Sequence, residues 1–472
     1  MQQILLFGAG KSATSLIRYL VGVTAARNWR LVVADSDLAL ASSKIGSAPH
    51  ARAVATNVAD QPAREALIKE ADIVISLLPP ALHYLVAGSC LVYKKNLLTA
   101  SYLDPAIRKL EKEIRDSGLL FLCEMGLDPG IDHMSAMELI GQVNEEGGRI
   151  HSFRSHTGGL VAPESDDNPW HYKISWNPRN VVLAGSAGAA YKEEGRTITR
   201  TYGQLFDRPG IVSVNGIGSL AWYPNRDSLS YIPVYGLEEA ETFIRTTLRY
   251  PEFCRAWSGI VDAGLTDDQH ALRTAPAPNS NDRTPGSTSL TAGITDRTPG
   301  RSTLNPGSTA HTPGTQLSSA LTFADWSAPL LPYVNDSNRT AFEFLGLFDP
   351  SPVPAHARSS ADILQYLLET RLAMQPQDKD MIVMLHEISY KTAAASREVT
   401  STLIVKGEDN LQTAMARTVG LPLGIAAKLI LEGTIRLTGL HIPILPEIYI
   451  PVLRELEEQG IRFEKATLEK VP

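Results

Sequence analysis

The chain has 472 residues, of which 43% are hydrophobic and 20% charged, and its formal net charge is −7. This composition is typical of a globular enzyme with two or three domains, and the negative charge argues against nucleic acid or an anionic membrane as the main partner. No run of about 18 apolar residues is present, so we expect no membrane-spanning helix. The three cysteines (Cys90, Cys123 and Cys254) lack metal-ligand spacing and are too few for a disulfide framework. We therefore expect no metal site and a reducing, cytoplasmic setting.

The first 130 residues alternate short apolar runs with segments of helical periodicity. Apolar runs of strand length occur at 4–7, 31–34, 73–78, 97–100 and 119–122. Helical spacing occurs at 12–23 and 63–70. Strands that alternate with helices in this way predict an α/β fold built on a Rossmann-type, doubly wound parallel sheet.

Beyond residue 150 the pattern is less regular, and we expect a second domain of mixed strands and helices. Helices are expected at 338–348, 360–374, 411–432 (with local breaks at Pro422 and Gly424) and 448–460, and paired strands at 380–386 and 401–405. Residues 270–318 repeat Thr, Pro and Gly almost without large apolar side chains, as in DRTPGST at 282–288. Because such a segment buries too little apolar surface to offset its ordering entropy, we predict a disordered insertion. The alternative is a docking or modification segment.

The loop at residues 8–13 has the sequence Gly-Ala-Gly-Lys-Ser-Ala, follows the first apolar run and opens a predicted helix. Gly8 permits a tight turn, Gly10 lets the backbone approach phosphates, and the small Ala13 lets the helix lie close to the strand. Because a helix N-terminus favours negative charge, this unit predicts a site for a dinucleotide pyrophosphate. An ordinary glycine turn is the alternative interpretation.

Asp35 lies 22 positions after Ala13, at the end of the second apolar run. A carboxylate there accepts hydrogen bonds from the adenosine ribose and repels a ribose 2′-phosphate. No arginine follows it, although Lys44 is near in sequence, so we expect NAD to be favoured over NADP as cofactor. The alternative is a helix N-cap, a role that Ser36 or Asp37 would fill equally well.

Two further strand ends are expected at the ligand edge of the sheet. Leu78-Pro79 ends the run at 73–78, and Ser101-Tyr102 follows the run at 97–100. The carboxyl ends of parallel strands line the ligand crevice of such a sheet. We therefore expect the first pair beside the second ribose of the cofactor and the second pair on the same edge of the sheet.

The segment 124–134, EMGLDPGIDHM, carries the densest group of ionisable residues. The ionisable side chains of this loop, Asp128 and His133 among them, are candidates for acid–base chemistry. The alternatives are that Asp128 before Pro-Gly only forms a turn and that Asp132 only caps a helix.

Arg226 lies in YPNRDS at 223–228, and Arg249 lies in EEAETFIRTTLRY at 238–250. A guanidinium group binds carboxylates in a bidentate manner, so both arginines are candidate anchors for an acidic substrate. A structural ion pair is the alternative for each.

Together these stretches resemble the saccharopine dehydrogenase family, in particular its L-glutamate-forming (saccharopine reductase) branch of lysine metabolism. The specific matches are GLDPGIDH at 126–133 and NPWHYKISW at 168–176, and further matches are VISLLP at 74–79 and TVGLPLGIAAKLILEGTI at 418–435. The resemblance covers nearly the whole chain outside about 270–330.

The resemblance implies a domain organisation. It places a dinucleotide-binding domain at 1–130, on which residues 436–472 pack back, a catalytic α/β domain at 131–250 and 375–435, and a helical insertion at 251–374 that contains the segment 270–318. It also implies a homodimer.

Roles for individual residues are implied as well. The cofactor is expected to contact Gly8, Ala9, Gly10, Lys11, Ser12, Ala13, Asp35, Ser36, Leu78, Pro79, Leu127 and Ser175. The substrate is expected to contact Ser101, Tyr102, Asp128, Arg226, Thr247, Leu248 and Arg249. The residues expected to take part in acid–base chemistry are Asp128, Tyr102 and His133.

The implied reaction is the NAD(P)-dependent interconversion of saccharopine with 2-aminoadipate 6-semialdehyde and L-glutamate. Hydride leaves the carbon beside the secondary amine, and water then cleaves the imine. The alternatives are a related polyamine-precursor dehydrogenase of the carboxynorspermidine type, against which the two arginines argue, and a catalytically silent dinucleotide-binding protein.

Two departures from the family pattern bear on the site. Fungal-type members carry a Cys-Arg pair after the second strand and use NADP, whereas residues 35–37 here are Asp-Ser-Asp, as in the animal, NAD-using type. Thr157 stands where the family has a cysteine, so no thiol is essential there.

Overall fold

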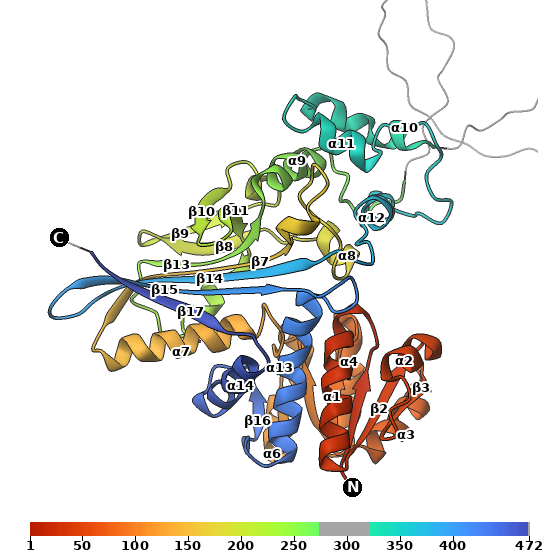
Figure 1. Ribbon diagram of the computed structural model, residues 1–472, viewed down its shortest axis with the longest axis vertical. Helices are drawn as coiled ribbons and strands as arrows, with labels where there is room; N and C mark the ends of the chain where they lie inside the picture. The colour runs from red at the N-terminus through yellow and green to blue at the C-terminus, as the bar shows by residue number, and fades with distance from the viewer. Residues whose placement is uncertain (273–320, 471–472) are drawn as a thin grey trace, which may run out of the picture.

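The computed structural model describes residues 1–272 and 321–470. In Figure 1 the first sheet and its helices form the lower lobe, a second, longer sheet crosses the middle, and the helices α9 to α12 form the upper end. Most of the segment 270–318, for which we predict disorder, lies outside the described residues.

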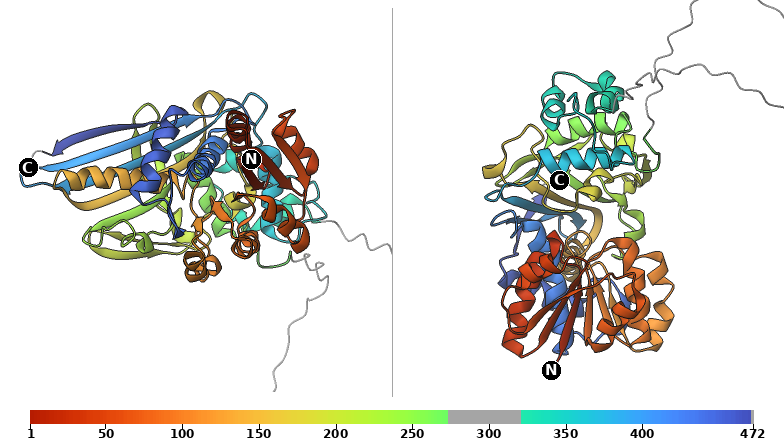
Figure 2. Two further views of the ribbon diagram at one scale, coloured as in Figure 1. Left: turned by 90° about the horizontal axis from the view of Figure 1, so that it is seen from below. Right: turned by 90° about the vertical axis from the view of Figure 1, so that its right-hand side faces the viewer.

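The first sheet contains seven parallel strands in the order β16-β6-β5-β4-β1-β2-β3. Its strands are β1 (Gln3–Phe7), β2 (Arg30–Asp35), β3 (Ala51–Ala55), β4 (Ile73–Ser76), β5 (Asn96–Thr99), β6 (Leu120–Leu122) and β16 (Gly439–His441). Its helices are η1 (Lys11–Ala13), α1 (Thr14–Arg27), α2 (Leu38–Ile45), α3 (Gln61–Glu70), η2 (Pro80–Leu82), α4 (His83–Val92), α5 (Pro105–Arg108) and α6 (Glu111–Asp116). The expected Rossmann-type sheet is confirmed, with helices on both sides of it (Figure 2, right).

Burial on both faces explains why these strands are continuous apolar runs. In β1, Ile4 and Leu6 belong to the core that includes α1, whereas Leu5 and Phe7 belong to the core on the opposite face. A strand that is covered on both faces has no solvent-exposed face, so apolar and polar residues do not alternate in its sequence.

The second sheet contains ten strands, and seven of them lie in the order β10-β11-β13-β7-β14-β15-β17. The strands are β7 (Arg149–Val161), β8 (Ala189–Glu193), β9 (Arg196–Arg200), β10 (Gly210–Val214), β11 (Gly218–Pro224), β12 (Arg226–Asp227), β13 (Thr242–Arg249), β14 (Asp380–Lys391), β15 (Ser396–Lys406) and β17 (Phe463–Lys470). The sheet is mixed, because β13 runs parallel to β7 whereas β14 runs antiparallel to both β7 and β15. The helix α7 (Ile131–Glu145) lies below the sheet in Figure 1 and packs on β7 and β14.

The insertion between β13 and β14 is helical among its described residues. It contains α9 (Pro251–Asp262), α10 (Phe323–Ser327), η6 (Ala328–Tyr333), α11 (Arg339–Leu345) and α12 (Ser360–Arg371). These helices share one apolar core with the segment 168–176 and with α8 (Pro178–Val182), and Trp170, Trp257 and Tyr172 are its largest fully buried side chains.

The helix α13 (Ala414–Leu431) differs from our expectation in two ways. It is continuous through Pro422 and Gly424, where we expected local breaks. It also packs along α1 in the core of the first sheet, although we assigned residues 375–435 to the catalytic domain. A Cβ atom at Gly420 would lie 2.9 Å from Leu16 Cβ, so the glycines allow this close approach rather than interrupting the helix.

By length and composition α13 would suffice to span a membrane, but 72% of that stretch is buried within the protein. Burial on several sides explains the apolar composition of this helix without reference to a lipid phase.

The C-terminal segment 436–472 divides between the two sheets. β16 pairs with β6 in the first sheet, where we expected the whole segment to pack. After α14 (Pro446–Glu458) the chain crosses to the second sheet, and β17 pairs with β15. The expectation is therefore wrong for β17, because this strand finds its backbone partners at the edge of the second sheet.

Candidate active site and dinucleotide site

The glycine-rich loop has the geometry that a pyrophosphate requires. Gly8 has a φ of +101°, and a Cβ atom there would lie 2.6 Å from the Leu77 carbonyl oxygen. A Cβ atom at Gly10 would meet nothing within 4 Å, so the space beside it is open. No side chain caps the N-terminus of η1. The N–H groups of Gly10, Lys11 and Ser12 are therefore suited to a phosphate group, whereas the Ala13 N–H donates to the Gly10 carbonyl oxygen.

The Asp35 carboxylate braces the loop from within the protein. Its Oδ2 accepts a hydrogen bond of 2.6 Å from Ala9 N–H, and its Oδ1 accepts one of 2.9 Å from Asp37 N–H. The Ser36 hydroxyl donates to the same Oδ1 at 3.3 Å. A carboxylate at position 35 therefore has a second role besides ribose binding, which is to fix the backbone of the loop by accepting hydrogen bonds from its N–H groups.

Lys44 extends from α2 to the start of α1. Its Nζ lies 2.6 Å from the Gly10 carbonyl oxygen and 2.8 Å from Thr14 Oγ1. Burial lowers the pKa of Lys44 to about 8, although the nearby Asp35 carboxylate opposes this shift. A cation therefore lies beside the loop, on a residue 34 positions from Gly10.

A buried imidazole joins the ends of β4 and β5. His83 Nδ1 lies 2.8 Å from Ser76 Oγ, and its Nε2 lies 2.8 Å from Ser101 Oγ. Burial lowers the pKa of His83 to about 4, so the ring is neutral at pH 7 and orients the Ser101 hydroxyl. Leu78 and Pro79 follow β4 directly beyond Leu77, whose carbonyl lies against the glycine loop.

Four ionisable side chains meet where the two sheets face each other. Tyr102 donates a hydrogen bond of 3.1 Å to Asp128 Oδ1. Arg245 Nη2 donates to the same oxygen at 2.6 Å and to Asp132 Oδ2 at 2.7 Å. Arg245 comes from β13, Tyr102 and Asp128 lie in the loops after β5 and β6, and Asp132 lies in the first turn of α7, so the cluster joins the two domains.

The pKa values of the two carboxyl groups in this cluster are shifted in opposite directions. Burial raises the pKa of Asp128, against the opposing effect of Arg245. For Asp132 burial acts in the same direction, but His133, Arg245 and the Gly130 N–H bring its pKa below the ordinary value. Asp132 is therefore a fixed anion, whereas Asp128 is suited to take up and release a proton.

His133 lies behind this cluster and not in the pocket. Its ring is fully buried, with Nε2 2.8 Å from Glu124 Oε2 and Nδ1 2.6 Å from the Tyr235 hydroxyl. The Tyr231 hydroxyl also donates to Glu124 Oε2, at 3.1 Å. Our placement of His133 among the groups that reach the substrate is not supported by this geometry, because both ring nitrogens have protein partners and Glu124 stands between the ring and the pocket.

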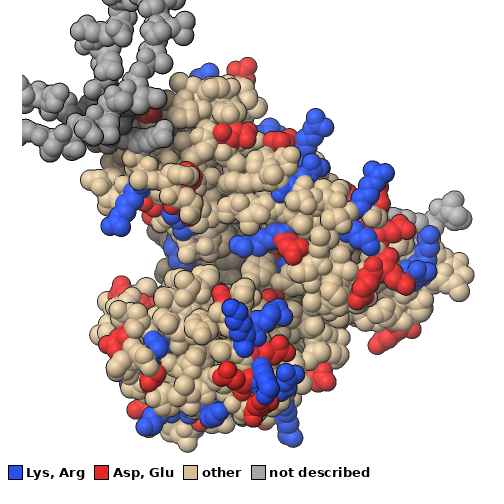
Figure 3. Space-filling model, turned by 180° about the vertical axis from the view of Figure 1, so that it is seen from behind, with Lys and Arg blue, Asp and Glu red and all other residues tan. Residues whose placement is uncertain are grey.

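A pocket of about 490 Å³ opens beside Tyr102, Glu124 and Tyr231. Four arginines line it, namely Arg108, Arg200, Arg226 and Arg245. The Arg226 guanidinium lies 5.2 Å from the centre of the Tyr102 ring. Seen from behind, the molecule is hollowed between the lower lobe and the upper part, with Lys and Arg side chains along the upper rim (Figure 3).

The three predicted substrate residues on β13, Thr247, Leu248 and Arg249, lie on two different faces of the strand. Side chains of a strand point alternately to its two faces, so Thr247 and Arg249 share the face of Arg245. Leu248 points to the other face and is buried with Leu160 and Val383. Its side chain therefore points away from Arg245 and Arg249, so the expected contact of Leu248 with the substrate would come from its backbone.

Arg249 is buried beside the aromatic rings of the insertion. Its guanidinium carbon lies 5.3 Å from the Tyr172 ring centre and 5.4 Å from that of Phe253. Nη1 donates to the Leu248 carbonyl oxygen at 2.8 Å, and Nε has no partner among the described residues.

Two residues expected at the cofactor lie in packed surroundings. Ser175 is buried and hydrogen-bonded to Asp380, whose carboxylate accepts from Ala414 N–H at 2.6 Å at the start of α13. Leu127 is buried in the core of the first sheet. The structure thus places both residues at the junction of the two domains.

The sequence argument missed Arg245, Glu124 and Tyr231. Arg245 lies four residues before Arg249, so the two-residue period of a strand was the signal that places both on one face. Glu124 follows the strand at 120–122 directly, where strand ends line the ligand edge. No local signal marks Tyr231.

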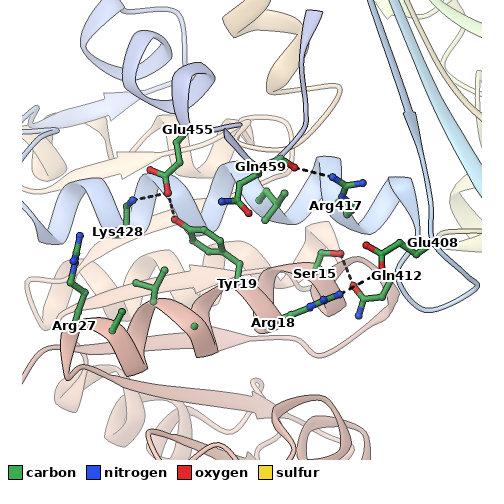
Figure 4. A pocket seen from close by; sticks show the side chains of 14 residues that line it. Ser15, Arg18, Tyr19, Arg27, Glu408, Gln412, Arg417, Lys428, Glu455 and Gln459 are labelled. Carbon is green, nitrogen blue, oxygen red and sulfur yellow. Dashed lines mark hydrogen bonds and ion pairs between the residues drawn. The ribbon is translucent and has the colours of Figure 1, made fainter. Parts of the chain in front are cut away.

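A second pocket, of about 580 Å³, lies between α1, α13 and α14 (Figure 4). Four of its charged groups form two ion pairs, because Lys428 binds Glu455 at 2.6 Å and Arg18 faces Glu408 at 3.7 Å. Tyr19 donates to the same Glu455 carboxylate. These contacts join three helices, and none of the predicted site residues lines this pocket.

Comparison with known proteins covers both domains. The model of the saccharopine dehydrogenase NADP binding domain matches residues 4–122, and that of the saccharopine dehydrogenase C-terminal domain matches residues 126–461. The mitochondrial alpha-aminoadipic semialdehyde synthase of Bos taurus is 34% identical over 469 residues, which cover 98% of this chain and 47% of the relative. The chain thus spans about half the length of the first curated relatives that it matches.

A fungal relative matches over its whole length. The NADP(+)-dependent, L-glutamate-forming saccharopine dehydrogenase of Saccharomyces cerevisiae is 33% identical over 478 residues, which cover 99% of both chains. Two further fungal relatives carry the same NADP(+) name. These names and the NADP-binding family model contradict our expectation of NAD. The argument failed because it treated the Asp35 carboxylate as free to repel a 2′-phosphate, whereas this carboxylate is occupied by backbone N–H groups beside the Lys44 ammonium.

Solved structures agree with the fold. Apo saccharopine dehydrogenase (L-Glu forming) from Saccharomyces cerevisiae has a TM-score of 0.81 at 30% identity and covers 99% of this chain and 100% of its own. Homospermidine synthase from Legionella pneumophila, with a TM-score of 0.53 at 8% identity, shares the fold alone. By its family matches, its relatives and its structure, the chain belongs to the saccharopine dehydrogenase family.

Proposed function

We propose that the protein is an L-glutamate-forming saccharopine dehydrogenase of lysine metabolism, which interconverts saccharopine with 2-aminoadipate 6-semialdehyde and L-glutamate. The observation that carries the proposal is the pocket lined by four arginines beside the Tyr102–Asp128 pair. Saccharopine has three carboxylates and a secondary amine, so it needs several cationic anchors and a group that exchanges protons. The names of the fungal relatives support NADP as the cofactor.

The dinucleotide would be held by the loop from Gly8 to Ala13. The open space at Gly10 and the uncapped N-terminus of η1 fit its pyrophosphate. Leu78 and Pro79 follow Leu77, whose carbonyl oxygen lies against Gly8, and they would contact the nicotinamide side of the cofactor. A nicotinamide cofactor held there would supply the hydride acceptor for the substrate carbon beside the amine.

The protein's own contribution is orientation and proton transfer. Arg226 at the rim and Arg249 at the far end of β13 are suited to bind carboxylates bidentately. Asp128, whose pKa is raised by burial, is suited to hold the proton that moves at the substrate nitrogen and at the attacking water. Tyr102 orients Asp128 through its hydrogen bond. Anchors that fix the substrate in this way lower the entropic part of the barrier.

The proposal includes an oligomeric state and a cellular location. A homodimer is expected from the family resemblance. A cytoplasmic setting is supported by Cys90, Cys123 and Cys254, which are all free and buried.

An assay of NADPH formation from saccharopine and NADP(+) at alkaline pH tests the function. Turnover with saccharopine, and none with a polyamine conjugate of carboxynorspermidine type, supports the proposal. The Arg226→Ala variant should raise the Michaelis constant for saccharopine by more than about tenfold, or 1.4 kcal/mol. Absence of turnover with saccharopine would overturn the proposed activity, and an unchanged Michaelis constant would remove the role of Arg226.

A further inference from the structure

Arg245 is the only deeply buried arginine among those lining the substrate pocket. Its side chain is 2% exposed, whereas Arg108, Arg200 and Arg226 are exposed. The guanidinium carbon lies 4.5 Å from the centre of the Tyr231 ring and 5.9 Å from that of Tyr102. Two aromatic rings and two carboxylates thus hold this side chain in one orientation.

One edge of this guanidinium group is unused. Nη2 donates to Asp128 and Asp132, but Nη1 is buried and has no partner among the described residues. A buried donor without an acceptor costs about 1–3 kcal/mol, and more for a charged group. Native structures rarely keep such a donor unless a ligand, a water or an ion satisfies it.

We propose that Nη1 of Arg245 binds a carboxylate of the substrate, as a third arginine anchor at the floor of the pocket. The inference rests on the proposed function, because saccharopine supplies the carboxylates. Arg245 and Arg249 lie on one face of β13, roughly 13 Å apart at 3.3 Å per residue. Each keeps a buried guanidinium N–H that has no hydrogen-bond partner in the part of the chain that the structure describes. An extended substrate lying along this face would meet one anchor near each end.

This anchor also places the substrate against the proton-holding group. Nη2 of Arg245 donates to Asp128, and Nη1 lies in the same plane of the guanidinium group. A substrate carboxylate bound to Nη1 therefore lies beside the Asp128 carboxyl group. The Asp128, Asp132 and Arg245 charges sum to a net negative charge when both carboxyl groups are ionised. Carboxylate binding is therefore favoured when Asp128 carries a proton, which matches the direction of its pKa shift.

The Arg245→Lys variant separates anchoring from structural support. Lysine keeps the positive charge beside Asp128 and Asp132 but lacks the planar fork with two donor edges. We expect the Kd for saccharopine, measured by calorimetry, to rise at least tenfold while the Kd for NADPH stays within twofold. Arg154→Lys is the matched control, because Arg154 is also on the second sheet, pairs with Glu193 at 3.4 Å and keeps a partnerless Nε outside the pocket.

Monoamides of saccharopine, each lacking one carboxylate charge, identify the group that Arg245 binds. The wild-type enzyme should bind one monoamide at least tenfold more weakly than saccharopine, and this ratio should collapse in Arg245→Lys. A double variant, Arg245→Met with Asp132→Asn, removes one charge of each sign and should lose the same discrimination if the lysine variant does not fold. Saccharopine binding with unchanged ratios in a folded variant would overturn this inference alone. A wild-type enzyme that does not bind saccharopine would overturn the inference together with the proposed function.

Discussion

The Tyr102 hydroxyl and the Asp128 carboxylate are joined by a hydrogen bond of 3.1 Å, although the two residues lie 26 positions apart. Tyr102 follows β5 and Asp128 follows β6, and these strands are neighbours in the first sheet. Arg245 of the second sheet donates to the same Asp128 oxygen at 2.6 Å. The protonation of Asp128 therefore depends on groups from both domains.

Asp128→Asn should lower kcat/KM by about 100-fold or more, because the amide cannot take up the proton. The same change should raise the thermal midpoint at pH 7. Since burial raises the folded-state pKa of Asp128, its favourable protonated form is lost as pH rises through that pKa, and an ionised buried carboxylate then costs stability. Asp116→Asn, on the exposed surface of α6, is the control. Unchanged kcat/KM would exclude the acid–base role.

Gly8→Ala and Gly10→Ala should have different effects. At Gly8 a methyl group would lie 2.6 Å from a backbone oxygen at a φ of +101°, so this variant should lose stability by about 1–3 kcal/mol. At Gly10 the methyl group meets no protein atom, so the variant should fold normally but bind NADPH at least tenfold more weakly. Denaturant titration and NADPH fluorescence give the two readouts. Normal NADPH binding by Gly10→Ala would place the pyrophosphate elsewhere.

Stability should fall as the pH decreases from about 6.5 to 4, in part because of His386. Burial lowers the pKa of His386 to about 4, so its neutral folded form is favoured above that pH, whereas the unfolded chain takes up a proton near pH 6.5. The stabilisation is complete above about 6.5 and is lost towards 4, with a size of about 3 kcal/mol.

His386→Gln should flatten this part of the curve of unfolding free energy against pH. His270→Gln is the control, because the His270 side chain is 84% exposed. A slope that is equal in wild type and His386→Gln would show that other groups cause the acid sensitivity.

Thr157 tests the face of the sheet that carries Arg245 and Arg249. Thr157 pairs in register with Thr247, and its buried hydroxyl has no partner among the described residues. Thr157→Val should therefore fold with equal or greater stability but bind saccharopine several-fold more weakly, while Thr157→Ser keeps the affinity. Calorimetry of both variants checks this, and equal affinity in Thr157→Val would show that the hydroxyl faces no ligand.

Two helix glycines should respond oppositely to alanine. Gly22 on α1 has nothing within 4 Å of a Cβ atom, so Gly22→Ala should stabilise the protein by about 1 kcal/mol through helix propensity. At Gly420 on α13 the added atom would lie 3.0 Å from the Leu16 backbone nitrogen, and Gly420→Ala should destabilise by about 1–3 kcal/mol. Chemical denaturation measures both, and the same sign for the two variants would contradict the close packing of α1 on α13.

Local patterns predicted much of the first domain. Apolar runs that end in glycine or polar residues predicted β1, β2, β4, β5 and β6, but not β3, which is half exposed, or β16, which is only three residues long. The rule that parallel strands end at one edge placed Tyr102 at the ligand edge, and the family resemblance added Asp128. The same approach did not separate the side chain of Leu248 from those of Thr247 and Arg249, although a one-residue step along a strand changes the face on which a side chain lies. It failed for the NAD preference, because the backbone partners of Asp35 are not visible in the sequence.

The sequence by itself determined the fold class, the phosphate-binding loop and the family, since these depend on the order and spacing of residues close together in the chain. The tertiary structure decided the rest of the site. Arg245 meets Asp128 across 117 positions, and β17 leaves the first domain to pair with β15. Contacts of this range depend on strand register and on how two domains face each other, which no local pattern encodes. The loop at residues 8–13 therefore marks a dinucleotide site, whereas the arginine-lined pocket exists only in the folded chain.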